Sequence, residues 1–282
     1  MHTGFTSTWP YTPPGQALGE HCSLPPGCNH QRRTCYTSTV KILVTGFEPF
    51  AGLPHNPSSA LLEHLPERLG EAQLVRATLP VDTHRAPEAL QGLYHRHRPA
   101  VALHLGLAAG RTLLSIERLA VNLLDFEIAD NSGHRPQDTP ILPGSPLALH
   151  TRLPLRAIQA RWAEAGIPGV VSNSAGLYLC NQVMYLALAT LPPEVPAGFI
   201  HLPPDETLAL HKPQAFVPLQ TQAQAIRLAL QVTLEHKTRP AQSPDTPPSR
   251  SGLVPGGEQL QEAVQNMPES AVVAQSAKVE PA

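Results

Sequence analysis

The sequence has almost no net charge and no long apolar run. Lys and Arg number 20 against 22 Asp and Glu, which gives a formal net charge of −2. This balance offers no electrostatic reason to expect binding to nucleic acid or to an acidic membrane surface. No stretch approaches 18 uninterrupted apolar residues, so no membrane helix is expected. The N-terminus lacks the basic and apolar parts of a secretory signal, and we therefore expect a cytoplasmic protein.

Proline is abundant, at 32 residues, but unevenly spread. Residues 1–39 are rich in Pro, Thr, Gly and Ser and show no periodicity, and residues 237–282 are rich in Pro, Ser, Gln and Glu. Neither segment carries enough apolar surface to offset the entropy of ordering. We therefore expect two disordered tails around one domain at residues 40–236, which is long enough for a sizeable core.

Three of the four cysteines lie in the first tail, at Cys22, Cys28 and Cys35. With His21 and His30 nearby, a metal knuckle is an alternative to a solvated tail, but the spacings match no familiar zinc pattern. A further hypothesis is that the native chain starts at Val40, because a valine codon can serve as a bacterial start.

In the central part, short apolar runs alternate with segments of helical character. Strands are expected at 41–47, 73–81, 100–106, 115–124, 169–175 and 198–202. Helices are expected at 57–69, 85–98, 147–165, 179–191 and 221–236. The first has Asn56 as its cap and Pro57 at its first position, and the third is expected to be interrupted near Pro154. This alternation predicts a single α/β domain with a twisted, open, mostly parallel sheet and helices on both faces. In such sheets ligands bind beyond the carboxyl ends of the strands. Phe47, Leu107, Gly176 and His201 lie at these ends, so we expect them on one rim.

Cys180 is the only cysteine after Val40. It follows an expected strand and turn and opens the expected helix at 179–191. Unpaired N–H groups and the helix dipole at such a junction favour a thiolate, the nucleophilic form of the side chain. The alternative is a small buried hydrophobe, which is the common role of a lone cysteine.

Thiol catalysis also needs a base, and the base usually needs a group that orients it. His201 ends the last expected strand and is the candidate base. Glu117 lies among apolar neighbours and is the candidate orienting carboxylate, with a simple ion pair to Arg111 or Arg118 as the alternative. Composition and spacing alone leave both possibilities open.

Five motifs occur in order between residues 41 and 204. They are Gly46–Gly52 with Asn56–Ser58, Gly110–Thr112 with Glu117–Ala120 and Asn122, Ile128–Asn131, Ser174–Gly176 with Cys180–Asn181, and Gly198–His201. Together they resemble the motifs of the pyroglutamyl peptidase I, or pyrrolidone-carboxylate peptidase, family of cysteine peptidases. One such match would be weak, whereas five in the same order are strong.

The resemblance implies a cysteine exopeptidase that removes an N-terminal pyroglutamyl residue, a five-membered lactam, from peptides. Cys180 would attack the pyroglutamyl carbonyl, His201 would act as base and then as acid, and Glu117 would orient the imidazole. A thioester would form and then be hydrolysed, with N–H groups at the start of the Cys180 helix stabilising the oxyanion. The resemblance implies no metal and no cofactor. It implies that the protein forms a homodimer or a homotetramer.

The resemblance also implies a lactam pocket, to which we assign Phe47, Phe50, Asn56, Leu107, Ile128 and Leu179. Three positions depart from the family pattern: Leu107 stands where glutamine is usual, Glu127 where arginine is usual, and Ala51 where glycine is usual. These departures keep an alternative open, a non-catalytic or altered-specificity relative that binds N-terminally blocked peptides. The presence of Cys180, His201 and Glu117 together argues against a pure binder.

Overall fold

A computed structural model of the chain describes residues 39–238. The expected disordered tails, and the metal knuckle considered for the first of them, therefore lie outside the described residues, apart from a few residues at their inner ends. Of these, Lys237 and Thr238 form the end of the last helix. Within the described range no helix is long and apolar enough to cross a membrane.

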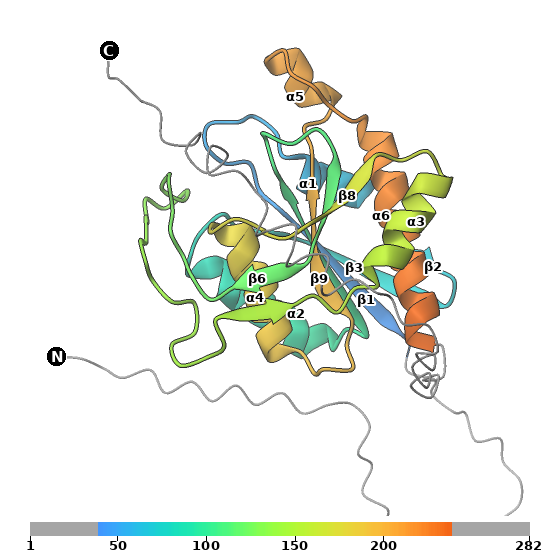
Figure 1. The fold of residues 1–282 in the computed structure, drawn as a ribbon, viewed down its shortest axis with the longest axis horizontal. Coiled ribbons are helices and arrows are strands. Elements are labelled where there is room, and N and C mark those ends of the chain that lie inside the picture. The colour runs from blue at the N-terminus through green and yellow to red at the C-terminus, as the bar shows by residue number, and fades with distance from the viewer. Residues whose placement is uncertain (1–38, 239–282) are drawn as a thin grey trace, which may run out of the picture. The chain divides into compact units, whose positions relative to one another are not determined.

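A seven-stranded sheet forms the centre of the described part (Figure 1). Its strands are β1 (Lys41–Phe47), β2 (Arg68–Leu69), β3 (Ala72–Leu79), β4 (Val101–Leu107), β5 (Leu114–Glu117), β8 (Gly169–Ser172) and β9 (Ala197–Leu202). Their order is β2-β3-β1-β4-β9-β5-β8. Only β2 with β3 and β5 with β9 pair antiparallel, which confirms the mostly parallel sheet.

Helices cover both faces of this sheet, as expected (Figure 1). One face packs against α1 (Pro57–Glu63), α3 (Leu155–Glu164) and α6 (Leu219–Thr238), and the other against α2 (Arg85–His97) and α4 (Leu179–Thr190). A two-stranded sheet of β6 (Leu119–Val121) and β7 (Ala148–His150) lies against α4. Because the central strands are covered on both sides, β1 and β4 are apolar almost throughout rather than alternating.

Two expected helices were wrong at one end. The helix expected at 57–69 ends at Glu63, because Pro66 disfavours helical geometry in the residues before it. The helix expected at 147–165 begins only at Leu155, directly after Pro154, where the interruption was expected. Its first part instead forms β7, which pairs antiparallel with β6.

Other differences come from short elements. The strand expected at 115–124 is two strands, β5 and β6, which belong to different sheets. The strand expected at 169–175 ends at Ser172. A short helix, α5 (Glu206–His211), was not expected, and its first turn is capped by the buried side chain of Asp205.

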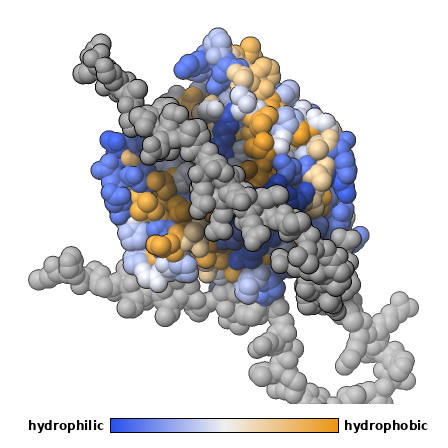
Figure 2. Space-filling view, in the orientation of Figure 1, coloured by the Kyte–Doolittle hydropathy of each residue, from blue (hydrophilic) through white to orange (hydrophobic). Residues whose placement is uncertain are grey.

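The segment around α5 also exposes apolar side chains. Leu210 is 88% exposed and Phe216 is 46% exposed. Figure 2 shows apolar atoms at the top of the view, where Figure 1 places α5. Leu147, just before β7, is similarly exposed.

The core holds one histidine that lies away from the sheet edge described below. His104 is fully buried on β4, with Nδ1 2.8 Å from the Thr45 hydroxyl and Nε2 2.9 Å from the Tyr94 hydroxyl. Burial lowers the pKa of His104 to about 3. The folded state therefore binds fewer protons than the unfolded state between pH 6.5 and pH 3, and its stability falls as the pH falls through this window.

We predict that His104 alone removes about 2 kcal/mol of stability between pH 7 and pH 5. The measurement is the free energy of urea unfolding at a series of pH values. His104→Gln should flatten the fall in stability, whatever its effect at pH 7. His95→Gln, at an exposed position of α2, is the control and should keep the wild-type slope. An unchanged slope in His104→Gln would contradict the prediction.

Candidate active site

The register of the sheet brings two predicted site residues, His201 and Glu117, to one place. His201 on β9 is paired with Gly106 on β4 and with Ser115 on β5. Because side chains alternate along a strand, Glu117 lies on the same face as Ser115 and diagonally opposite His201. A carboxylate two residues along the neighbouring antiparallel strand is therefore within reach of the imidazole.

A hydrogen bond joins these two side chains. His201 Nδ1 lies 2.8 Å from Glu117 Oε1, and both side chains are buried. The same oxygen accepts a hydrogen bond of 2.5 Å from Arg111 Nη1. The sequence left open whether Glu117 forms an ion pair with Arg111 or Arg118 instead of orienting His201. In the structure Glu117 contacts both Arg111 and His201. Because Nδ1 is bonded to the carboxylate, Nε2 is the ring nitrogen available to a reacting group.

Cys180 is the second residue of α4 and lines the same pocket as His201. Its sulfur lies over Gly106 on β4: a Cβ atom at that glycine would be 2.7 Å from Sγ and 2.8 Å from the Phe199 ring. The glycine therefore leaves the space that the thiol and Phe199 occupy. The first N–H groups of α4 have no helical acceptor, as at any helix start.

Burial sets the protonation of the thiol and the imidazole. It raises the pKa of Cys180 to about 12, and the negative charge of Glu117 acts in the same direction, against Arg111 and the Cys180 N–H. Burial also lowers the pKa of His201, although Glu117 opposes this. Burial therefore opposes the thiolate that the helix start favours.

A cavity of about 130 Å³ opens beside the thiol. Five of the six residues assigned to a lactam pocket line it, together with three that sequence reasoning did not select. The first group is Phe47, Phe50, Asn56, Leu107 and Leu179, and the second is Val81, Ala175 and Tyr178. Ile128 does not line this cavity and is 46% exposed. Two of these could have been found from their positions in the sequence. Tyr178 comes directly before the helix that carries Cys180, and Ala175 ends an expected strand.

Asn56 lines the cavity, but its side chain is engaged within the protein. Its Oδ1 accepts hydrogen bonds from the N–H and hydroxyl of Ser58, and its Nδ2 donates to the Glu48 carbonyl. It is the N-cap of α1, as the sequence predicts. These bonds fix the loop that carries Phe50.

Aromatic rings build one wall of the cavity. The Tyr178 ring lies 4.3 Å from that of Phe126 and 6.1 Å from that of Phe50, measured between centroids. Its hydroxyl donates to the Ala129 carbonyl at 3.2 Å. Tyr178 thus connects the start of α4 to the segment around residue 129.

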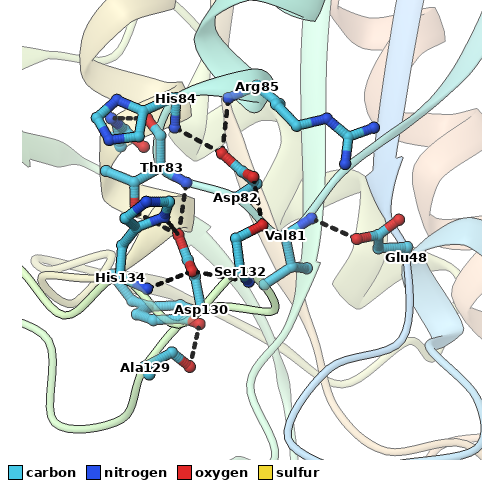
Figure 3. A network of polar contacts seen from close by, with 12 residues as sticks. Glu48, Val81, Asp82, Thr83, His84, Arg85, Ala129, Asp130, Ser132 and His134 are labelled. Atoms are coloured by element: carbon cyan, nitrogen blue, oxygen red, sulfur yellow. Dashed lines mark hydrogen bonds and ion pairs between the residues drawn. The ribbon is translucent and has the colours of Figure 1, made fainter.

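A polar network joins the segments at residues 81–85 and 129–134 (Figure 3). Asp130 accepts hydrogen bonds from the N–H and hydroxyl of Thr83 and from the N–H groups of Ser132 and His134. Burial alone would raise the pKa of Asp130, but these bonds lower it to about 2. The Glu48 carboxylate accepts from the Val81 N–H in the same view.

Asp82, Asp130 and His134 have potential ligand atoms within 4.8 Å of one another. The oxygens of both carboxylates, however, accept hydrogen bonds from backbone N–H and hydroxyl groups. These donors take the positions that a cation would need. The cluster fits a network that holds loops together better than a metal site.

The three departures from the family pattern differ in their setting. Ala51 has a φ of 53° and so adopts the left-handed conformation that favours glycine, at a cost of roughly 1 kcal/mol. Leu107 ends β4 and is paired through its backbone with β9. Glu127 is exposed, so its charge is well solvated.

Comparisons with known proteins identify the family of the chain. The sequence model described as pyroglutamyl peptidase matches residues 40–236. The pyrrolidone-carboxylate peptidase of Pyrococcus furiosus is 42% identical over 205 residues, covering 70% of this chain and 99% of the relative. That of Deinococcus radiodurans is 43% identical over 199 residues, covering 67% and 91%.

A solved structure is also similar. The crystal structure of pyrrolidone carboxyl peptidase from Thermus thermophilus matches with a TM-score of 0.67 and 59% sequence identity. The match covers 68% of this chain and 99% of that one.

We predict that Gly106→Ala destabilises the fold by about 2 kcal/mol, because the added methyl group overlaps Sγ and the Phe199 ring. Urea unfolding measures this change. Gly92→Ala is the matched control, since that glycine lies in α2 with no atom within 4 Å of an added Cβ. It should gain up to about 1 kcal/mol. Equal stability of both variants would show that the space over Gly106 is not filled as described.

Proposed function

This chain belongs to the pyroglutamyl peptidase family of cysteine peptidases, which remove N-terminal pyroglutamyl residues, and we propose that Cys180, His201 and Glu117 carry out this reaction. The observation that carries the proposal is the buried His201–Glu117 hydrogen bond, beside a cavity that also receives the Cys180 thiol. Nucleophile, base and orienting carboxylate are the three parts that thiol catalysis requires.

The first half of the reaction begins with two neutral groups. As Sγ bonds to the pyroglutamyl carbonyl carbon, the thiol proton passes to His201 Nε2 and the carbonyl electrons move to oxygen. Collapse breaks the C–N bond, and the imidazolium gives its proton to the departing amine. The shortened peptide leaves, and a thioester on Cys180 remains.

The second half returns the enzyme to its starting state. Water attacks the thioester while His201 Nε2 takes its proton. Collapse breaks the C–S bond, pyroglutamate leaves, and the proton passes to the sulfur. Glu117 remains ionised and stabilises the imidazolium in both halves, which is the role of the third member of such a triad.

The oxyanion of each tetrahedral intermediate needs hydrogen-bond donors. Backbone N–H groups in the first turn of α4 have no helical acceptor and lie next to the nucleophile. Removing one such donor typically costs about 3 kcal/mol of transition-state stabilisation.

The cavity supports recognition of a lactam rather than of a free amino terminus. Its lining is largely apolar, with Phe47, Tyr178 and Leu179 among the walls, and it contains no carboxylate side chain that would pair with an ammonium group. Pyroglutamate has no free amine, so a small apolar cavity suits its ring.

Further properties stay proposals. Residues 40–236 form the catalytic domain. The cytoplasm is the proposed compartment, because a nucleophilic free thiol needs reducing surroundings. A homodimer or homotetramer is the proposed assembly, supported by the exposed apolar side chains of Leu210 and Phe216.

We predict that Cys180→Ala releases no chromophore from a pyroglutamyl amide, while His201→Asn and Glu117→Gln lose most of the wild-type kcat/KM. His201→Asn should lose more, by about 100-fold or more, because it removes the proton acceptor itself. A rapid-quench experiment with wild type, analysed by mass spectrometry, should detect pyroglutamyl-Cys180.

Equal turnover by Cys180→Ala would remove the assigned nucleophile. Binding of blocked peptides by a folded and reduced wild type without turnover would instead favour the non-catalytic relative.

We also predict that Tyr178→Ala raises KM for a pyroglutamyl amide by about tenfold to a hundredfold, because it removes an apolar wall of the cavity. Tyr178→Phe keeps the ring and should stay near the wild-type KM. Steady-state kinetics on both variants measure the difference. A KM of Tyr178→Ala close to that of wild type would show that the ring does not contact the lactam.

A further inference from the structure

Arg111 lies between two parts of the site that no other side chain in the described residues connects by hydrogen bonds. Its Nη1 donates to Glu117 Oε1, and its Nη2 donates to the Ser174 carbonyl at 3.0 Å. Ser174 belongs to the turn between β8 and α4, the helix that carries Cys180. One guanidinium therefore bridges the carboxylate that holds the imidazole and the turn that leads to the thiol.

We propose that Arg111 is a positioning residue, which holds Glu117 against His201 and ties this pair to the turn before the nucleophile helix. The inference rests on the function proposed above. Arg111 acts through Glu117 and the backbone and needs no contact with the substrate.

The surroundings of the Glu117 carboxylate explain why Arg111 matters. Glu117 is fully buried, and its Oε2 has no hydrogen-bond partner among residues 39–238. Its Oε1 has two, His201 and Arg111. Without Arg111, the buried negative charge of Glu117 would have the His201 imidazole as its single hydrogen-bond donor. Burying a charge with so few partners costs free energy.

Two geometric features favour arginine over lysine. The acceptors of Arg111 are a carboxylate oxygen of β5 and a carbonyl oxygen of a separate turn, and the planar guanidinium offers two N–H groups in a fixed fork. A lysine ammonium would keep the charge, but its flexible stem would not hold both acceptors at a set separation. Among the residues that the structure describes, Arg111 and not Arg118 is the arginine that pairs with Glu117.

The charge of Arg111 also acts on both reacting groups. It lowers the pKa of Cys180, against burial and Glu117, and it lowers the pKa of His201 in the same direction as burial. Removing the positive charge should therefore raise the pKa of both. A higher pKa of His201 moves the acid limb of the kcat/KM profile to higher pH, because the base must be neutral to accept the thiol proton.

The experiment compares wild type, Arg111→Gln and Arg111→Lys in a pH series of kcat/KM on a pyroglutamyl amide. Arg111→Gln should lose about 100-fold in kcat/KM at pH 7, the loss expected from a misplaced catalytic group. Its acid limb should move up by about one pH unit. Arg111→Lys, which keeps the charge without the fork, should keep the wild-type acid limb but recover only part of the rate. Arg96→Gln, at an exposed position of α2, is the control and should behave as wild type.

A second readout does not depend on turnover. The rate at which iodoacetamide alkylates Cys180, followed by mass spectrometry of the peptide that contains it, reports the ionisation of the thiol at each pH. In Arg111→Gln the alkylation profile should move to higher pH. Circular dichroism and thermal unfolding check that each variant is folded.

The outcomes separate this proposal from the function on which it rests. An active wild type with unchanged pH and alkylation profiles in a folded Arg111→Gln would overturn the role of Arg111 alone. A shifted alkylation profile in a chain that never cleaves pyroglutamyl amides would support the role of Arg111 while overturning the peptidase reaction. A loss of rate with no shift in either profile would overturn the proposal, since it would mean that Arg111 is only structural.

Discussion

A single carboxylate oxygen organises the candidate active site. Glu117 Oε1 accepts hydrogen bonds from both His201 and Arg111 in a buried position. The first bond leaves Nε2 of the imidazole for proton transfer, and the second supplies the positive charge that a buried carboxylate requires. The arrangement depends on β5 running antiparallel to β9 in an otherwise mostly parallel sheet, because that register sets Glu117 diagonally opposite His201.

The surroundings of the thiol oppose its ionisation. Burial and the charge of Glu117 raise the pKa of Cys180, while burial lowers that of His201. Both shifts favour the proposed mechanism, in which the thiol passes its proton to the imidazole as the sulfur attacks. A neutral site also suits the substrate, since the lactam carries no charge and the cavity walls are largely apolar.

Much of the fold and site could be predicted from residue types and their order. The buried strands β1, β4 and β9 appear as short apolar runs, and Asn56 before Pro57 marks a helix start, as the structure confirms. The failures have physical causes. The segment 148–150 forms a strand because β6 is beside it, and the pocket residues Val81 and Tyr178 come from loops whose paths depend on contacts such as that between Thr83 and Asp130.

The sequence by itself determined the α/β class and the family, and it selected the thiol, imidazole and carboxylate of the proposed site, because apolar periodicity and motif order are properties of the linear chain. The tertiary structure decided which arginine pairs with Glu117, which side chains line the cavity, and which groups surround the Cys180 thiol. These are questions of distance and solvent access, and both arise only when segments up to 84 residues apart, as Glu117 and His201 are, come together.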